Sequence, residues 1–248
     1  MSSDLDPALE AALAAVAARR PLLVASDYDG VLARLRDDPS AAVPEPGVSE
    51  ALASLAAVDG VAVALVSGRG VEDLQRTSGL AGPFRWVGSH GAEYDGPLSG
   101  DLAEHRDELA RLLGPEVAGT PGARLEVKPA SVAVHVRQVA DRDAAAELLA
   151  RARALVDSSL TMKPGKDVLE MAVTDADKGS ALRRLMADLG AAGAVYLGDD
   201  VTDEDGFRAL AGNGVSVKVG EGETAAHHRV PDPAGALRVL TRLRELLA

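Results

Sequence analysis

The sequence predicts an α/β fold, in which a doubly wound parallel-sheet core is interrupted by a smaller α+β domain. Continuous apolar runs at 22–25, 61–66 and 194–197 are typical of parallel strands that are buried on both faces. Stretches with helical spacing separate these runs, as right-handed βαβ crossovers require. Between residues 100 and 172 the pattern changes to strands that alternate apolar and polar residues, which indicates a half-buried antiparallel sheet.

The first part of the core can be followed element by element. Asp6-Pro7 is typical of a helix start, because an N-cap residue is followed by proline at the first helical position. The charged, proline-containing loop 34–46 follows the first strand. The next elements are a helix marked by Val48, Leu52 and Leu55, the strand 61–66, a short helix with Val71 and Leu74, and the segment 86–93.

The inserted segment has its own order of elements, α-β-β-α-β-β. Its strands carry apolar residues on one face, so we expect its two helices to cover that face. We therefore predict a core at residues 1–99 and 173–248 and an inserted domain at 100–172. The insertion comprises a helix with Leu102, Leu109 and Leu113, a loop at 114–122, strands at 124–128 and 131–137, a helix through Leu148 and Leu155, and strands at 160–163 and 166–172.

The βαβ pattern resumes after the insertion. Asp177 is an N-cap for a helix that carries Leu182 and Leu185, and Gly190 ends this helix. The remaining elements are the strand 194–197, a helix capped by Thr202, the strand 214–219, and a terminal helix marked by Leu237, Leu240 and Leu247.

Composition excludes several classes of function. The formal net charge of −12 disfavours a nucleic-acid or anionic-membrane surface, and the 2% of aromatic residues leaves few platforms for stacking bases. The chain has no cysteine, so disulfides and thiolate metal sites are absent. No apolar run reaches the roughly 18 residues of a membrane span, and the acidic N-terminal stretch does not resemble a signal peptide. We expect a cytoplasmic monomer.

Candidate site residues follow the predicted core strands. Asp27 and Asp29 come directly after the first strand, Ser67 follows the second, and Asp199 and Asp200 follow the strand 194–197. The carboxyl ends of parallel strands meet at one sheet edge, where open α/β sheets bind ligands. Lys178 lies at a helix start that can reach the same edge. Taken singly, each residue has a simpler explanation, as an Asx turn, a helix N-cap or a solvated lysine.

Together these residue types favour phosphoryl transfer. Carboxylates that converge repel one another unless a hard cation lies among them, and an oxygen-only ligand set suits Mg²⁺. A carboxylate can attack phosphorus to form an aspartyl-phosphate, while a second carboxylate exchanges protons. Ser67 and the following N–H groups of Gly68 and Arg69 can hold the phosphate, and Lys178 supplies fixed positive charge. Chemistry alone allows either Asp27 or Asp29 to be the nucleophile.

The motifs resemble those of a known superfamily. Asp27-Tyr28-Asp29-Gly30-Val31, Ser67, Lys178 and Asp199-Asp200 occur in the order found in haloacid-dehalogenase-like phosphotransferases. The resemblance implies that Asp27 is the nucleophile and Asp29 the acid/base. It also implies that Mg²⁺ is held by the Asp27 carboxylate, the Asp29 carbonyl and Asp199, with Asp200 adjacent and Asp203 supporting the loop. The insertion then corresponds to a substrate-specifying cap.

Longer stretches narrow the resemblance to the trehalose-6-phosphate phosphatases. They are Ser67-Gly68-Arg69, the segment 88–93 around His90, Lys128 with Ser131, His135-Val136-Arg137, Gly165-Lys166 with Glu170, Asp177-Lys178-Gly179, and 198–204. Two positions depart from the family pattern, since Val31 stands where threonine is usual and Val136 where tyrosine is usual. The second departure concerns how the cap holds a sugar.

The strand pattern of the insertion independently suggests a sugar-binding face. His135 and Arg137 alternate with valines, and Lys166 and Glu170 alternate with Leu169 and Met171. One face is therefore apolar, and the other offers donors and acceptors to a hydroxyl-rich ligand. The simpler alternative is a solvated outer face. The predicted substrate-binding residues are Ser67, Gly68, Arg69, His90, Lys128, His135, Arg137, Lys166 and Glu170.

These observations predict a Mg²⁺-dependent phosphoric monoester hydrolase that converts trehalose 6-phosphate to trehalose. One alternative is a phosphatase of the same superfamily for another sugar phosphate, such as sucrose 6-phosphate or mannosyl-phosphoglycerate. A second is a non-catalytic module that binds a sugar phosphate and serves a synthase. A trehalose-phosphate synthase is a candidate partner in either case.

Overall fold

The chain folds into two compact units in a computed structural model that describes residues 5–156, 160–212 and 214–248. One unit comprises the described residues before Pro97 together with Ala176–Ala248, and the other is Pro97–Asp175. The division predicted from the sequence, after residues 99 and 172, differs from these boundaries by three residues at each crossing. We refer to the two units as the core unit and the inserted unit.

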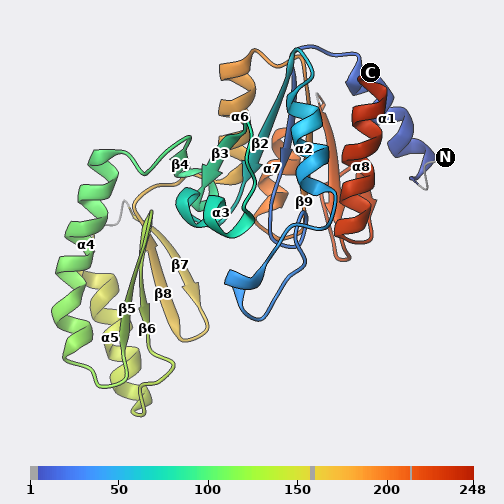
Figure 1. The fold of residues 1–248 in the computed structure, drawn as a ribbon. Helices are drawn as coiled ribbons and strands as arrows, with labels where there is room; N and C mark the ends of the chain where they lie inside the picture. The colour runs from blue at the N-terminus through green and yellow to red at the C-terminus, as the bar shows by residue number, and fades with distance from the viewer. Residues whose placement is uncertain (1–4, 157–159, 213) are drawn as a thin grey trace. The chain divides into compact units, whose positions relative to one another are not determined.

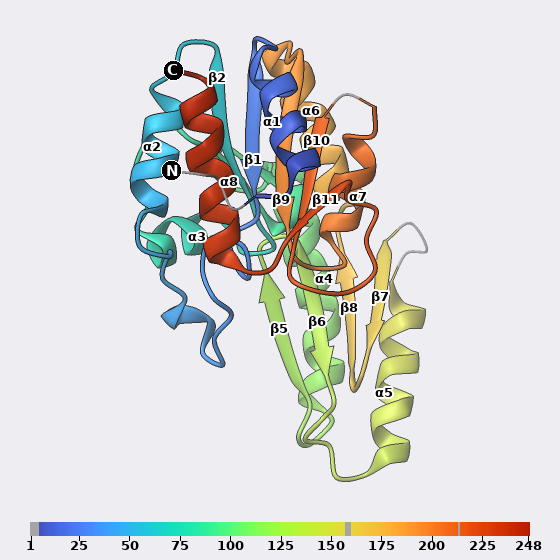
Figure 2. The same ribbon diagram turned by 90° about the vertical axis from the view of Figure 1, so that its right-hand side faces the viewer.

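The core unit is built on a seven-stranded sheet with the order β11-β10-β9-β1-β2-β3-β4. Figure 1 labels β2, β3, β4 and β9, and Figure 2 labels β1, β10 and β11. All neighbours are parallel except β3 and β4, which pair antiparallel. The strand order runs outward from β1 in both directions, so the winding reverses between β1 and β9. The strands are β1 Leu22–Ser26, β2 Val61–Val66, β3 Arg85–Gly88, β4 Glu93–Tyr94, β9 Gly193–Gly198, β10 Gly214–Val219 and β11 His228–Val230.

Helices cover both faces of this sheet, as the doubly wound prediction requires. Leu9, Leu52 and Leu240 pack with the residues of β1 and β9 that face one side, and Leu182 and Phe207 pack with those that face the other. Helices α1, α2 and α8 therefore lie on one face and α6 and α7 on the opposite face (Figure 2). The helices are α1 Pro7–Ala17, α2 Val48–Ala56, α3 Val71–Ser78, α6 Lys178–Leu189, α7 Asp203–Ala209 and α8 Pro233–Leu246, with short 3₁₀ helices at Pro39–Ala41 and Ser89–Gly91.

The inserted unit has the predicted α-β-β-α-β-β order and an antiparallel sheet, β5-β6-β8-β7. Val132, Val134, Leu169 and Met171 are buried, because their sheet face packs on the helices. The opposite face carries the polar residues Arg124, Glu126, Lys128, Ser131, His135 and Glu170. The elements are α4 Gly100–Ala118, β5 Arg124–Lys128, β6 Ser131–His135, α5 Arg142–Leu155, β7 Thr161–Gly165 and β8 Val168–Ala172.

Several details differ from the sequence prediction, which did not include β11 and expected Thr202 to cap α7, although its side chain makes no capping hydrogen bond. Helix α4 continues through Gly114 and Pro115 to Ala118, where a loop was predicted. Pro115 has no N–H for a helical hydrogen bond, but the burial of Leu113 and Val117 outweighs this loss. Strand β6 ends at His135, so Arg137 lies beyond it. Lys166 lies in the turn between β7 and β8.

None of the helices within the described ranges is long and apolar enough to cross a membrane.

Candidate active site

The predicted site residues of the core unit meet at the carboxyl edge of the central strands. Asp27 follows β1, Ser67 follows β2 and Asp199 follows β9, and these three strands are neighbours in the sheet. Asp27 and Asp199 flank the point at which the winding reverses, which is where open α/β sheets bind ligands. Lys178, the first residue of α6, reaches the same point.

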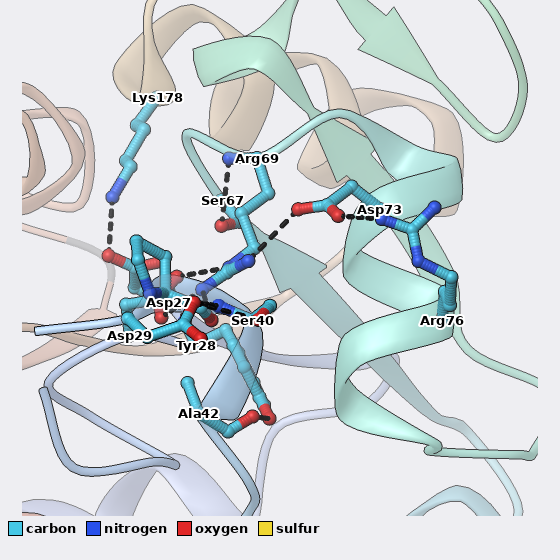
Figure 3. Close-up of polar contacts among 12 residues, drawn as sticks. Asp27, Tyr28, Asp29, Ser40, Ala42, Ser67, Arg69, Asp73, Arg76 and Lys178 are labelled. Atoms are coloured by element: carbon cyan, nitrogen blue, oxygen red, sulfur yellow. Dashed lines mark hydrogen bonds and ion pairs between the residues drawn. The ribbon is translucent and has the colours of Figure 1, made fainter. Parts of the chain in front are cut away.

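Asp27 and Lys178 form the centre of the site. The ammonium group of Lys178 donates to Asp27 Oδ2 at 2.7 Å and to Asp203 Oδ1 at 2.7 Å, and all three side chains are buried (Figure 3 shows Asp27 and Lys178). The second oxygen of Asp27 accepts the N–H of Tyr28 at 2.6 Å. Asp177 and Ser180 form a reciprocal capping box at the start of α6, which fixes the turn that carries Lys178.

Asp203 organises the loop that follows β9. Its Oδ2 accepts the backbone N–H groups of Asp199 at 2.9 Å and Asp200 at 3.0 Å, and its Oδ1 accepts the Tyr196 hydroxyl as well as Lys178. The carboxylate is fully buried and has four donors. It therefore holds the loop rather than facing an open cavity. The Asp200 carboxylate is exposed and accepts the N–H of Val201 at 2.7 Å.

Burial and crowding of the acids shift the proton affinities at this edge. Burial raises the pKa of Asp27 to about 7, partly opposed by Lys178, and burial with nearby Asp203 raises the pKa of Asp199 to about 6. Burial alone would lower the pKa of Lys178, but Asp27 and Asp203 outweigh it and raise that pKa. Burial raises the pKa of Tyr196 well above its usual value. Burial and the neighbouring acids therefore favour the protonated forms of Asp27 and Asp199.

The arrangement fits a hard divalent cation. Oxygens of Asp27, Asp199 and Asp203 lie within 4.8 Å of one another. Asp203 is saturated by donors, whereas no group among the described residues donates to the Asp199 carboxylate. Asp199 lies against Gly30, where a Cβ atom would come within 1.9 Å of Asp199 Oδ2 and where φ is +75°. Glycine at position 30 thus lets Asp199 approach the loop after β1, and the donor set is oxygen-only, as Mg²⁺ prefers.

Asp29 is oriented by Arg69. Its two oxygens accept Arg69 Nε at 2.6 Å and Nη2 at 2.8 Å, and this pair lies beside Asp27 in Figure 3. Arg69 was predicted to bind substrate through the phosphate loop. In the structure its guanidinium is occupied by Asp29, by Asp73 at 2.9 Å and by the carbonyl of Pro39 at 2.6 Å.

The loop after β2 is braced by the segment around His90. Ser67 Oγ accepts the N–H of Arg69 at 3.2 Å, and the N–H of His90 donates to the Ser67 carbonyl at 2.9 Å. The His90 ring packs over Gly68, where a Cβ atom would lie 2.6 Å from Cε1. The structure therefore brings Ser67, Gly68 and His90 together.

The predicted residues of the inserted unit fall into two groups. Glu170 accepts Lys128 Nζ at 2.7 Å and Ser131 Oγ at 2.6 Å, which forms one polar cluster. The second group contains His135, whose ring forms a hydrogen bond with Glu126 at 2.7 Å. His135 is four residues after Ser131 in β6, so the two residues lie about 13 Å apart along the strand. A pocket of about 280 Å³ lies at that second end of the sheet, lined by Gly122, Arg124, His135, Arg137, Gln138 and Asp167. Lys166 is exposed in the adjoining turn.

Sequence reasoning did not single out three side chains at these places. Tyr196 donates to Asp203, Lys218 donates to the carbonyl of Asp199, and Glu126 bonds to His135. A usable signal existed for Lys218, because a lysine within a strand expected to be buried on both faces needs an acceptor. Glu126 alternates with apolar residues on the same face as Lys128, which was a similar signal.

The fold and this site define a class of protein. A doubly wound core with acids after β1 and β9, a serine after β2, a buried lysine at the start of α6 and an inserted α+β unit are the features of a haloacid-dehalogenase-like protein. A sequence model of the family described as Trehalose-phosphatase matches residues 25–233. The chain belongs to the trehalose-phosphatase family.

Individual relatives agree with this assignment. The trehalose-phosphate phosphatase of Mycobacterium marinum is 36% identical over 245 residues, which cover 90% of this chain and 61% of the relative. The chain thus spans about three fifths of that relative's length. The structure of Aspergillus fumigatus trehalose-6-phosphate phosphatase superposes with a TM-score of 0.76 at 28% identity and covers 99% of both chains. The C-terminal domain of a Candida albicans trehalose synthase regulatory protein shares the fold at 15% identity, with a TM-score of 0.66 and coverage of 96% and 99%.

Proposed function

We propose that this protein hydrolyses trehalose 6-phosphate to trehalose and inorganic phosphate through an aspartyl-phosphate at Asp27. The observation that carries the proposal is the buried pair of Asp27 and Lys178 at 2.7 Å, next to Asp199 at the reversal point of the sheet. The family relationship supports the substrate. The intact Asp27 and Lys178 favour catalysis over a purely regulatory role, for which the same fold is also used.

In the first step, Asp27 attacks phosphorus while Asp29 acts as the general acid. The bond from an Asp27 oxygen to phosphorus forms, the ester P–O bond breaks, and the sugar oxygen takes the proton of Asp29. In the second step, water attacks phosphorus, Asp29 takes a proton from that water, and phosphate leaves with the Asp27 carboxylate regenerated. Lys178 holds the attacking carboxylate and offsets its charge throughout.

The phosphate is held by groups at the start of α3. The Ser67 hydroxyl and the backbone N–H of Gly68 can donate to its oxygens, since this loop leads into a helix N-terminus. We propose that the cation is Mg²⁺. The carboxylates of Asp27 and Asp199 and the backbone carbonyl of Asp29 would be its ligands, and Asp200 would lie next to it. When bound, a divalent cation supplies charge neutralisation for the phosphate and the attacking carboxylate.

We assign substrate selection to the inserted unit, as a cap. Lys128, Ser131 and Glu170 offer donors and acceptors for sugar hydroxyls. His135 and Arg137 line the pocket at the other end of the sheet, and Lys166 lies in the adjoining turn. His90, packed on Gly68, is placed next to the phosphate loop. The cytoplasmic location, the monomeric state and a synthase partner remain predictions from the sequence.

The test is phosphate release from a panel of sugar phosphates, with Mg²⁺ or with EDTA, for the wild type and Asp27→Asn. The panel contains trehalose 6-phosphate, sucrose 6-phosphate, mannosyl-phosphoglycerate and glucose 6-phosphate. We expect selective release from trehalose 6-phosphate that is lost with EDTA and in the variant. Hydrolysis of another sugar phosphate instead would show that the substrate assigned from the inserted unit is wrong, while the proposed chemistry would stand. A folded wild type that binds but hydrolyses none of the panel would make the protein a sugar-phosphate-binding module.

A further inference from the structure

The geometry of Asp29 identifies what fixes its orientation. A carboxylate offers about four lone-pair positions on its two oxygens. Arg69 Nε and Nη2 occupy one on each oxygen, at 2.6 and 2.8 Å, in the planar fork that a guanidinium forms with a carboxylate. One position on each oxygen is left for a proton and for the ester oxygen or water. This contact therefore sets the plane of the carboxylate without blocking its chemistry.

Arg69 is itself held in place. Nη1 donates to Asp73 Oδ2 at 2.9 Å (Figure 3). Nη2 also donates to the carbonyl of Pro39 at 2.6 Å, so the guanidinium makes four hydrogen bonds. Its side chain is only 11% exposed. The backbone of Arg69 is fixed as well, because its N–H donates to Ser67 Oγ and its carbonyl accepts the N–H of Ser89.

We propose that Arg69 is a positioning residue for Asp29, and that Asp73 acts with it by holding the guanidinium. This inference rests on the proposed function of Asp29 as the acid/base. Asp29 must present the same oxygen to a leaving sugar oxygen in one step and to a water in the next. A displacement of about 1 Å costs on the order of 100-fold in rate, so a free aspartate rotamer would be a poor catalyst.

The inference predicts a dependence on the leaving group. A sugar alkoxide leaves slowly without a proton, whereas nitrophenolate is a stable anion and needs little help. Arg69→Lys keeps the charge but loses the planar fork. We expect its kcat/KM to fall about 100-fold for trehalose 6-phosphate and less than about 10-fold for p-nitrophenyl phosphate. kcat/KM reports the first step, in which the two substrates differ.

Two further variants separate positioning from general damage. Asp73→Ala leaves Asp29 and Arg69 intact and removes the hydrogen bond from Arg69 Nη1, so we expect the same leaving-group pattern with a smaller loss. Arg76→Ala is the matched control, because Arg76 contacts the other oxygen of Asp73 at the surface and does not touch Arg69. It should keep wild-type rates on both substrates. An equal loss on both substrates in Arg69→Lys, or an undiminished rate on trehalose 6-phosphate, would refute the inference.

A measurement without turnover separates this inference from the proposed function. The Nε–H signal of Arg69 in a ¹H–¹⁵N spectrum can be assigned by its loss in Arg69→Lys. We expect slow exchange with water in the wild type and a clear shift in Asp29→Asn. If the wild type hydrolyses neither ester, the proposed function fails. If the signal exchanges freely or is unmoved by Asp29→Asn, the positioning role fails whatever the activity.

Discussion

Replacing Lys178 by methionine tests the electrostatics of the site most directly. The substitution keeps most of the side-chain volume and removes the only cation that contacts both Asp27 and Asp203 among the described residues. Both carboxylates stay buried, and breaking a buried ion pair by removing one partner costs about 3–5 kcal/mol. For a chain of this size, about 1 kcal/mol lowers Tm by roughly 2–4 °C, so we expect a loss on the order of 10 °C at pH 8 in EDTA.

The effect should depend on pH in a defined direction. Burial already raises the pKa of Asp27 to about 7, and loss of Lys178 raises it further. Near pH 5 the folded variant can therefore keep Asp27 protonated, while the unfolded chain ionises it. This relieves part of the cost, so the stability difference between wild type and variant should be smaller at pH 5 than at pH 8.

The assay is thermal unfolding followed by circular dichroism at both pH values, with Lys166→Met as the control. Lys166 is exposed in a turn, so its substitution should change the free energy of unfolding by no more than about 0.5 kcal/mol. A Lys178→Met protein that unfolds within about 1 kcal/mol of the wild type at pH 8 would contradict the reasoning. So would a loss that is larger at pH 5 than at pH 8.

Three other results are expected. Protons compete with a cation for Asp27 and Asp199, whose pKa values are about 7 and 6. Mg²⁺ should therefore raise Tm more at pH 8 than at pH 5. An equal rise at both pH values would contradict a cation site at these two residues. Gly30→Ala should weaken Mg²⁺ binding in calorimetry, whereas Gly220→Ala, with a similar φ of +81° and open space, should not. Glu170→Gln should raise KM for trehalose 6-phosphate about 10-fold with little change in kcat; the reverse would exclude a binding role.

Much of the core followed from local signals in the sequence. The apolar runs predicted β1, β2 and β9, and the Asp177 cap predicted the start of α6, since strand burial and helix capping depend on residues close in the chain. Local signals failed at the end of α4. Gly114 and Pro115 indicate a loop, but the burial of Leu113 and Val117 against the sheet keeps the helix intact.

The sequence by itself determined which chemical groups lie at the sheet edge. Asp27, Ser67 and Asp199 each follow a strand, and parallel strands bring their carboxyl ends together whatever the details of packing. Only the tertiary structure decided which partners these groups take. Lys178 pairs with Asp27, which lies 151 positions away in the sequence, and Arg69 pairs with Asp29, which lies 40 positions away. The two members of each pair meet only once the sheet has formed. Spacing along the chain carries no information on such pairs, since side-chain rotamers and loop packing select among several acids and cations of similar reach.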